Sequence, residues 1–161
     1  MATIGTLQRL SATSLSKLIL AAQEAAAAGD STPSLAIIDV RDDDYIGGHI
    51  KGSQNVPSRT LDAMLPTLVR QLQDKDTVVF HCALSQQRGP SAALRYLRER
   101  ERLLPTWNAR AREGDDDAPK PKEQKVYVLD RGFVGWQELF GTDERLTEGY
   151  RPELWKDGYW G

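Results

Sequence analysis

The chain has 161 residues, with 21 Lys and Arg against 23 Asp and Glu, so its formal net charge is only −2. This length suffices for one domain with a hydrophobic core. The absence of a basic excess argues against nucleic acid or an anionic membrane as a partner. No stretch approaches the roughly 18 apolar residues of a membrane span, and the first residues do not resemble a secretion signal. Because a single cysteine cannot form an internal disulfide, we expect a cytoplasmic or nuclear protein.

The first third of the chain predicts one helix and one buried strand. Residues 14–28 are rich in Leu and Ala and are followed by Gly29, which is typical of a helix and its stop. Residues 35–40 (LAIIDV) are mainly apolar, as in a strand buried on both faces. A loop is expected over 41–50, and residues 55–57 predict a very short strand ended by proline.

The rest of the chain continues the alternation of helices and strands. Residues 61–72 predict a helix whose apolar stripe is interrupted by Pro66. Residues 76–80 predict a buried strand, and the helix over 91–97 has Pro90 in its first turn. Residues 125–129 predict a further strand, and a short helix follows as far as Phe140. The alternation predicts an α/β fold with a parallel sheet covered on both faces.

Two segments differ from this pattern. Residues 105–122 contain charged runs and prolines, and we predict a mobile surface loop there. The aromatic tail over 150–161 is expected to pack back on the body, because exposed tryptophan is costly in water. The whole chain, 1–161, is expected to form a single domain.

The segment His81–Pro90 (HCALSQQRGP) carries the candidate chemistry. Its cysteine, Cys82, lies between a predicted strand end and a predicted helix start, and Arg88 follows six positions later. The N–H groups and dipole of such a turn bind anions and favour thiolate over thiol, so Cys82 should be nucleophilic near neutral pH. The planar guanidinium of Arg88 can hold two oxygens of a tetrahedral oxyanion. A buried structural cysteine is the alternative, but the arginine and the helix start favour a site.

Three segments resemble a known family. Residues 37–41 (IIDVR) and 48–57 (GHIKGSQNVP) resemble the first signature of rhodanese-like domains, and residues 129–136 (LDRGFVGW) resemble their late strand and turn. The segment His81–Pro90 resembles the active loop of the cell-division-cycle dual-specificity phosphatases. The likeness extends to a small single-domain plant and fungal branch, described as phosphatases, arsenate reductases or both. It implies a rhodanese-like three-layer α/β fold with a central five-stranded parallel sheet flanked by helices.

The resemblance also implies roles for the loop residues. Cys82 would be the nucleophile and Arg88 the oxyanion clamp. Ser85 is an auxiliary candidate, because its hydroxyl can hydrogen-bond the thiolate and assist its departure; a role in fixing the loop is equally open. The plant relatives hold a structural zinc with cysteines that this chain lacks, so no metal is expected. The backbone amides that would bind the oxyanion are those of Ala83, Leu84, Ser85, Gln86, Gln87 and Arg88.

A proton donor for the leaving group is missing from this loop. The cell-cycle enzymes carry an acidic residue inside it, whereas residues 83–87 here are not acidic. Proton donation is worth roughly 10²–10⁴ in rate. Asp130 and Asp39 end strands that should face the site and are candidates, but a structural role is favoured for both, more strongly for Asp39. His81 is expected to orient the loop by hydrogen bonding rather than to bind a metal or join a catalytic triad.

Three reactions suit such a loop. In a phosphatase acting on aryl phosphates, phosphotyrosine or dual-specificity substrates, Cys82 attacks phosphorus and water hydrolyses the phosphocysteine. In an arsenate reductase, Cys82 attacks arsenic, and glutathione with glutaredoxin completes the reduction, because no second cysteine is present. Sulfur transfer is the third reaction. Loop length argues against it, because the sulfurtransferases of this fold have a loop that is one residue shorter. The expected partners are a phosphate or arsenate oxyanion, with a phosphoprotein as a further candidate and no tightly bound cofactor.

Overall fold

The computed structural model describes residues 7–29, 34–112, 114 and 124–156. The strands are β1 (Gln8–Leu10), β2 (Leu35–Asp39), β3 (His49–Ile50), β4 (Gln54–Asn55), β5 (Thr77–His81), β6 (Lys125–Leu129) and β7 (Thr147–Glu148). The helices are α1 (Ala12–Ala27), α2 (Leu61–Gln71), α3 (Arg88–Arg112), α4 (Gly132–Phe140) and α5 (Pro152–Trp155), with a 3-10 turn, η2 (Ser58–Thr60), before α2. None of the described helices is long and apolar enough to cross a bilayer.

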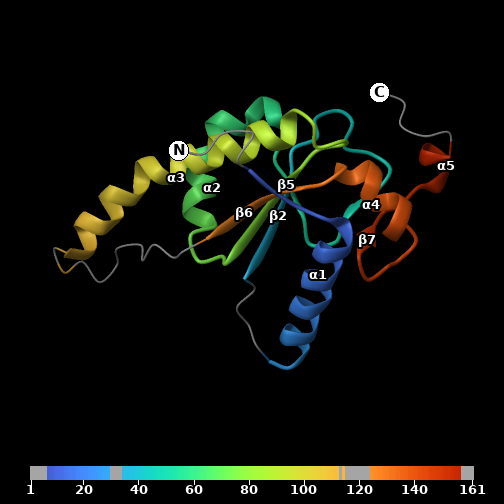
Figure 1. The fold of residues 1–161 in the computed structure, drawn as a ribbon, viewed down its shortest axis with the longest axis horizontal. Helices are drawn as coiled ribbons and strands as arrows, with labels where there is room; N and C mark the ends of the chain where they lie inside the picture. The colour runs from blue at the N-terminus through green and yellow to red at the C-terminus, as the bar shows by residue number, and fades with distance from the viewer. Residues whose placement is uncertain (1–6, 30–33, 113, 115–123, 157–161) are drawn as a thin grey trace.

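A five-stranded sheet of order β1-β6-β5-β2-β4 forms the centre, and every neighbouring pair in it is parallel. Helices α2 and α3 cover one face, and α1 and α4 cover the other (Figure 1). The predicted three-layer α/β fold is therefore confirmed. Strand β1 was not predicted, because its three residues, QRL, carry no hydrophobic pattern and are recognisable as a strand only through their pairing with β6.

The two cores follow from the alternation of side chains along the buried strands. On β5, Val78 and Phe80 face α2 and α3, whereas Val79 faces α1 and α4. Tyr96 of α3 is fully buried in the first core and Trp136 of α4 in the second. Because both faces are covered, the strands carry the nearly continuous apolar runs that made them visible in the sequence.

Helix α3 corrects the predicted position of the surface loop. The helix passes through Pro105 and ends at Arg112, so the first part of the segment predicted as a loop is helical. Proline removes one backbone donor, but the helix continues as far as the Ala and Arg residues at 109–112, which favour helix. Helix α2 likewise runs through Pro66 without a break. Residues 113 and 115–122 of the predicted loop lie outside the described residues.

Part of the aromatic tail packs against the body of the domain. Trp155 is buried, and its ring lies 5.5 Å from that of Phe133, centroid to centroid. Its indole Nε1 donates a hydrogen bond to the carbonyl of Gly47 at 2.9 Å. The end of the described chain thereby holds the loop that follows β2. Residues 157–161 lie outside the described residues.

Candidate active site

The candidate residues gather at one edge of the sheet because the strands are parallel. Their carboxyl ends share that edge, where α/β proteins place their ligands. Cys82 directly follows β5, and α3 begins at Arg88. The loop after β2 contributes Asp42 and Asp44, and Asp130 follows β6. The predicted strand–loop–helix setting of Cys82 and Arg88 is therefore present in the structure.

The loop from Cys82 to Arg88 curves around the cysteine sulfur. The Ser85 N–H donates a hydrogen bond to Cys82 Sγ, with the nitrogen 3.2 Å from the sulfur. Ser85 has a φ of 55°, a left-handed conformation that a residue other than glycine rarely adopts. A Cβ at Gly89 would lie 3.3 Å from Ser85 Oγ, a tight contact, so a larger residue there would press on the loop. The loop lines a cavity of about 190 Å³, formed by Cys82, Ala83, Leu84, Gln86, Gln87 and Arg88.

The first turn of α4 fixes the start of this loop from behind. The N–H of Phe133 donates to the Cys82 carbonyl at 3.0 Å, and that of Val134 to the Ala83 carbonyl at 2.9 Å. These N–H groups lack partners within their own helix, so they are free to bind the loop. A Cβ at Gly132 would lie 2.5 Å from both carbonyl oxygens, and its φ of 56° also favours glycine. The sequence pattern around Gly132 marked the fold but did not reveal this contact.

Two auxiliary candidates, Ser85 and Asp130, have different surroundings. The Ser85 hydroxyl is buried and has no hydrogen-bond partner among the described residues. The carboxylate of Asp130 is half exposed and reaches the loop through Arg9, whose Nη1 lies 3.5 Å from Asp130 Oδ1. Arg9 Nη2 donates to the Ser85 carbonyl at 3.2 Å. Sequence reasoning missed Arg9 because it lies on the unpredicted strand β1.

Asp39 and Arg41 form a fully buried ion pair. The Asp39 carboxylate accepts from Arg41 Nε at 3.0 and 3.1 Å and from Nη2 at 2.8 Å. Arg41 also donates to the carbonyls of Ile46 and Gly48, and its guanidinium lies 4.4 Å from the centre of the Phe133 ring. Asp39 therefore shapes the loop after β2, which agrees with the structural role favoured from the sequence. A carboxylate committed to these bonds is not free to donate a proton to a substrate.

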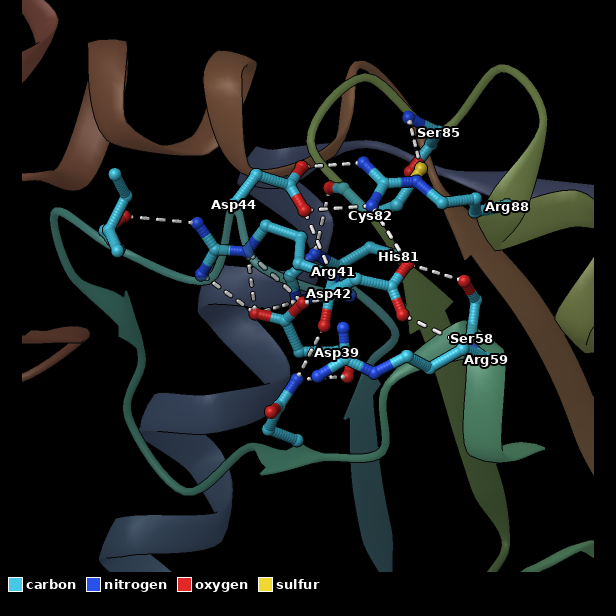
Figure 2. Close-up of polar contacts among 12 residues, drawn as sticks. Asp39, Arg41, Asp42, Asp44, Ser58, Arg59, His81, Cys82, Ser85 and Arg88 are labelled. Atoms are coloured by element: carbon cyan, nitrogen blue, oxygen red, sulfur yellow. Dashed lines mark hydrogen bonds and ion pairs between the residues drawn. The ribbon is translucent and has the colours of Figure 1, made fainter. Parts of the chain in front are cut away.

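Arg88 is paired with two carboxylates of that same loop. Its Nη1 and Nη2 donate to Asp44 Oδ1 and Oδ2 at 2.8 and 2.6 Å, and Nη1 lies 3.3 Å from Asp42 Oδ2 (Figure 2). The hydrogen bond with Asp44 raises the pKa of Arg88 above its ordinary value despite partial burial. The same bond lowers the pKa of Asp44. Sequence analysis treated 41–50 as a plain loop, because nothing in the chain links Asp44 to an arginine 44 positions later.

His81 supports the loop from inside the protein. It is fully buried, with Nδ1 3.1 Å from the Cys82 carbonyl oxygen and Nε2 3.8 Å from Asp39 Oδ2. Burial lowers the pKa of His81, and the opposing influence of Asp39 does not outweigh it, so the ring is neutral. His49 lies elsewhere, on β3, with Nε2 3.4 Å from Glu148 Oε1. Within the described ranges, no three His, Cys, Asp or Glu side chains cluster in a way that could hold a metal ion.

Comparison with known proteins assigns the family. A model described as "Rhodanese-like domain" matches residues 21–139. The chain belongs to this family. The rhodanese-like chain is 36% identical over 130 residues to the CDC25-like phosphatase YCH1 of Saccharomyces cerevisiae, covering 74% of this chain and 77% of that protein. It is 44% identical over 111 residues to arsenate reductase 2.1 of Oryza sativa subsp. japonica, covering 66% of this chain but only 59% of that protein.

Solved structures give the same assignment. A structure described as Ygr203w, a yeast protein tyrosine phosphatase of the rhodanese family, matches with a TM-score of 0.67 at 32% identity. The match covers 93% of the rhodanese-like chain and 98% of the yeast chain. The As-Sb reductase of Leishmania major matches with a TM-score of 0.56 at 24% identity, which supports the fold alone. The family resemblance inferred from residues 37–57, 81–90 and 129–136 is confirmed.

Proposed function

We propose that this protein is a phosphatase for aryl phosphates or phosphotyrosine-like esters, with Cys82 as its nucleophile. The observation that carries the proposal is the Ser85 N–H bound to Cys82 Sγ at 3.2 Å, in a loop that lines a cavity together with Arg88. Such an N–H stabilises a thiolate. The sulfur attacks phosphorus and the ester oxygen leaves. Water then hydrolyses the phosphocysteine and restores the thiolate.

The surrounding residues supply the remaining roles. Arg88 would hold two phosphoryl oxygens after leaving Asp44, and the backbone amides from Ala83 to Arg88 would bind the others. The buried Ser85 hydroxyl has no partner among the described residues, and it is therefore available to stabilise the departing thiolate. Asp130 remains an auxiliary candidate through its contact with Arg9. A phosphoprotein is the larger substrate that this chemistry admits, and the cytoplasm or nucleus would keep Cys82 reduced.

Arsenate reduction is the second candidate, supported by the 44% identity to the rice arsenate reductase. Arsenate has the charge and shape of phosphate, so the same loop would bind it. Cys82 and one glutathione would together supply the two electrons that reduce As(V) to As(III), becoming a mixed disulfide. A second glutathione and glutaredoxin would then reduce that disulfide. The single cysteine leaves no internal thiol for this step.

A side-by-side assay of the purified protein tests both candidates. The substrates are 4-nitrophenyl phosphate, arsenate with glutathione and glutaredoxin, and thiosulfate with cyanide. We expect turnover of the phosphate ester, abolished in Cys82→Ser because its hydroxyl does not ionise near neutral pH. Turnover of arsenate alone would replace the phosphatase with a reductase. Turnover of thiosulfate alone, or an active Cys82→Ser variant, would overturn the proposal.

A further inference from the structure

The Asp44 carboxylate occupies the atoms of Arg88 that an oxyanion needs. Both of its oxygens lie within 2.8 Å of the terminal nitrogens of Arg88. A guanidinium binds carboxylates and tetrahedral oxyanions through the same two parallel N–H groups. An oxyanion that binds Arg88 in the cavity therefore takes the place of Asp44 and leaves that carboxylate beside the ligand.

Asp44 and its neighbour Asp42 differ in what remains once Arg88 has turned to a ligand. Asp42 still accepts hydrogen bonds from Ser58 Oγ at 2.5 Å and from the Arg59 N–H at 3.1 Å, which keep it ionised. Asp44 Oδ1 keeps the Asp42 N–H at 3.0 Å. Asp44 Oδ2 accepts a hydrogen bond from Arg88 Nη2 at 2.6 Å. Asp44 Oδ2 is thus the oxygen that loses this donor when Arg88 turns to a ligand, and it can then carry a proton.

The backbone around Asp44 is held in place independently of Arg88. Arg41 Nη1 donates to the Ile46 carbonyl at 3.3 Å, and Trp155 Nε1 donates to the Gly47 carbonyl at 2.9 Å. The loop is therefore anchored to the buried frame on one side and to the tail on the other. Loss of the Arg88 contact frees the Asp44 side chain without releasing the loop.

Residues 83–87 include no acid that could protonate the leaving group, and Asp44 is placed to take that role. We propose that Asp44 is the proton donor to the leaving oxygen, and this rests on the phosphatase function proposed above. The other carboxylates considered are less suited: Asp39 is fully buried against Arg41, and Asp130 contacts Arg9 rather than Arg88. Asp44, by contrast, contacts the proposed oxyanion clamp with both carboxylate oxygens and loses these contacts when Arg88 binds a ligand.

The proton and the bonds balance over the two steps. The ester binds as its monoanion, and its proton passes to Asp44 when Arg88 turns to the phosphoryl oxygens. Cys82 Sγ then bonds to phosphorus while the P–O bond breaks, and Asp44 gives its proton to the departing oxygen. In the second step, water attacks phosphorus, Asp44 accepts a proton from that water, and the S–P bond breaks. Phosphate, the thiolate and a protonated Asp44 remain, and the next cycle begins when that proton leaves with phosphate.

The electrostatics of Asp44 agree with this order of steps. Hydrogen bonds from Arg88 hold the pKa of Asp44 below its ordinary value, although partial burial acts in the opposite direction. When Arg88 turns to the ligand, a phosphoryl group of negative charge replaces the neighbouring cation. Both changes favour the protonated carboxyl.

The test compares two phenols as leaving groups. Values of kcat/KM are measured with 4-nitrophenyl phosphate, whose leaving group is acidic, and with phenyl phosphate, whose leaving group needs a proton. In Asp44→Asn we expect kcat/KM to fall about 10²-fold for phenyl phosphate and only a few-fold for 4-nitrophenyl phosphate. Asp44→Glu keeps an acid and should recover part of the lost rate. Asp43→Asn is the matched control, because Asp43 is 91% exposed and pairs with Arg59.

Each outcome decides a separate point. Equal loss on both esters in Asp44→Asn would overturn the role as donor. An equal gain on both would also overturn it and would make Asp44 only a competitor for Arg88. A selective loss in Asp130→Asn instead would assign the proton to Asp130. Wild-type protein that hydrolyses neither ester would refute the proposed phosphatase itself, and the role of Asp44 would fall with it.

Discussion

Two arginine–aspartate pairs meet in the loop after β2, and they differ in what surrounds them. Arg41 and Asp39 are completely buried, and Arg41 donates to two backbone carbonyls besides the carboxylate. Arg88 and Asp44 lie at the edge of the cavity, where the Arg88 side chain is 31% exposed. The Arg41–Asp39 pair makes its contacts entirely inside the protein, whereas the N–H donors of Arg88 are accessible to a ligand.

The difference shows how one chemical pairing can serve structure in one place and binding in another. A buried charge is stable only while its partner remains, so the Asp39–Arg41 pair fixes the loop. The Arg88–Asp44 pair is only partly buried, so water can reach both charges and a ligand can take the place of the carboxylate. Because the buried pair and the tail hold the backbone, the partly buried Arg88–Asp44 pair can open without unfolding the loop.

The largest expected effect is on the buried pair. Arg41→Leu should lower the free energy of unfolding by about 3–5 kcal/mol, because Asp39 is left buried without its partner. Chemical denaturation measures the change. Arg59→Leu, which removes an exposed partner of Asp43, is the control and should change stability by less than about 1 kcal/mol. A loss of similar size in both variants would contradict the structural role of Arg41.

For the Arg88–Asp44 pair we expect the opposite result, a large loss of activity with little loss of stability. Arg88→Lys should lower kcat/KM for 4-nitrophenyl phosphate about 10²-fold, because a point charge cannot hold two oxygens as the planar guanidinium does. Its free energy of unfolding should change by less than about 1 kcal/mol. Steady-state kinetics and denaturation of the same preparation give both values. If stability falls with activity retained, Arg88 belongs with the structural pair.

The smallest effect concerns His81, which lies beside the buried pair. Burial lowers the pKa of His81, so its ring stays neutral in the folded protein at pH values where the same ring in the unfolded chain, with an ordinary pKa of about 6.5, takes up a proton. Stability is therefore complete above that value and falls as the pH drops below it, by at most about 1.4 kcal/mol per pH unit. Thermal unfolding between pH 8 and 5 should show a flatter profile in His81→Gln than in the wild type. His49→Gln is the control, and identical profiles in all three proteins would contradict this prediction.

The layers of the fold and the setting of Cys82 between a strand and a helix could be predicted from the amino-acid sequence. The buried strands are apolar runs, and Cys82 and Arg88 are separated by a loop whose chemistry is local, so both could be predicted from neighbouring residues. The family resemblance implied that the sheet has five strands but did not indicate which residues form the fifth. Strand β1, with Arg9, has no pattern of its own and exists through pairing with β6.

The distant groups that surround Cys82 are brought to it by the packing of the strands and helices. The contact of α4 with the Cys82 carbonyl joins residues 51 positions apart, and that of Arg88 with Asp44 joins residues 44 positions apart. Such pairs are set by the order of parallel strands, which brings their carboxyl ends to one edge. The three adjacent aspartates at 42–44 look alike in the sequence. Their surroundings separate them: Asp43 faces solvent, Asp42 is held by Ser58 and the Arg59 amide, and Asp44 is paired with Arg88.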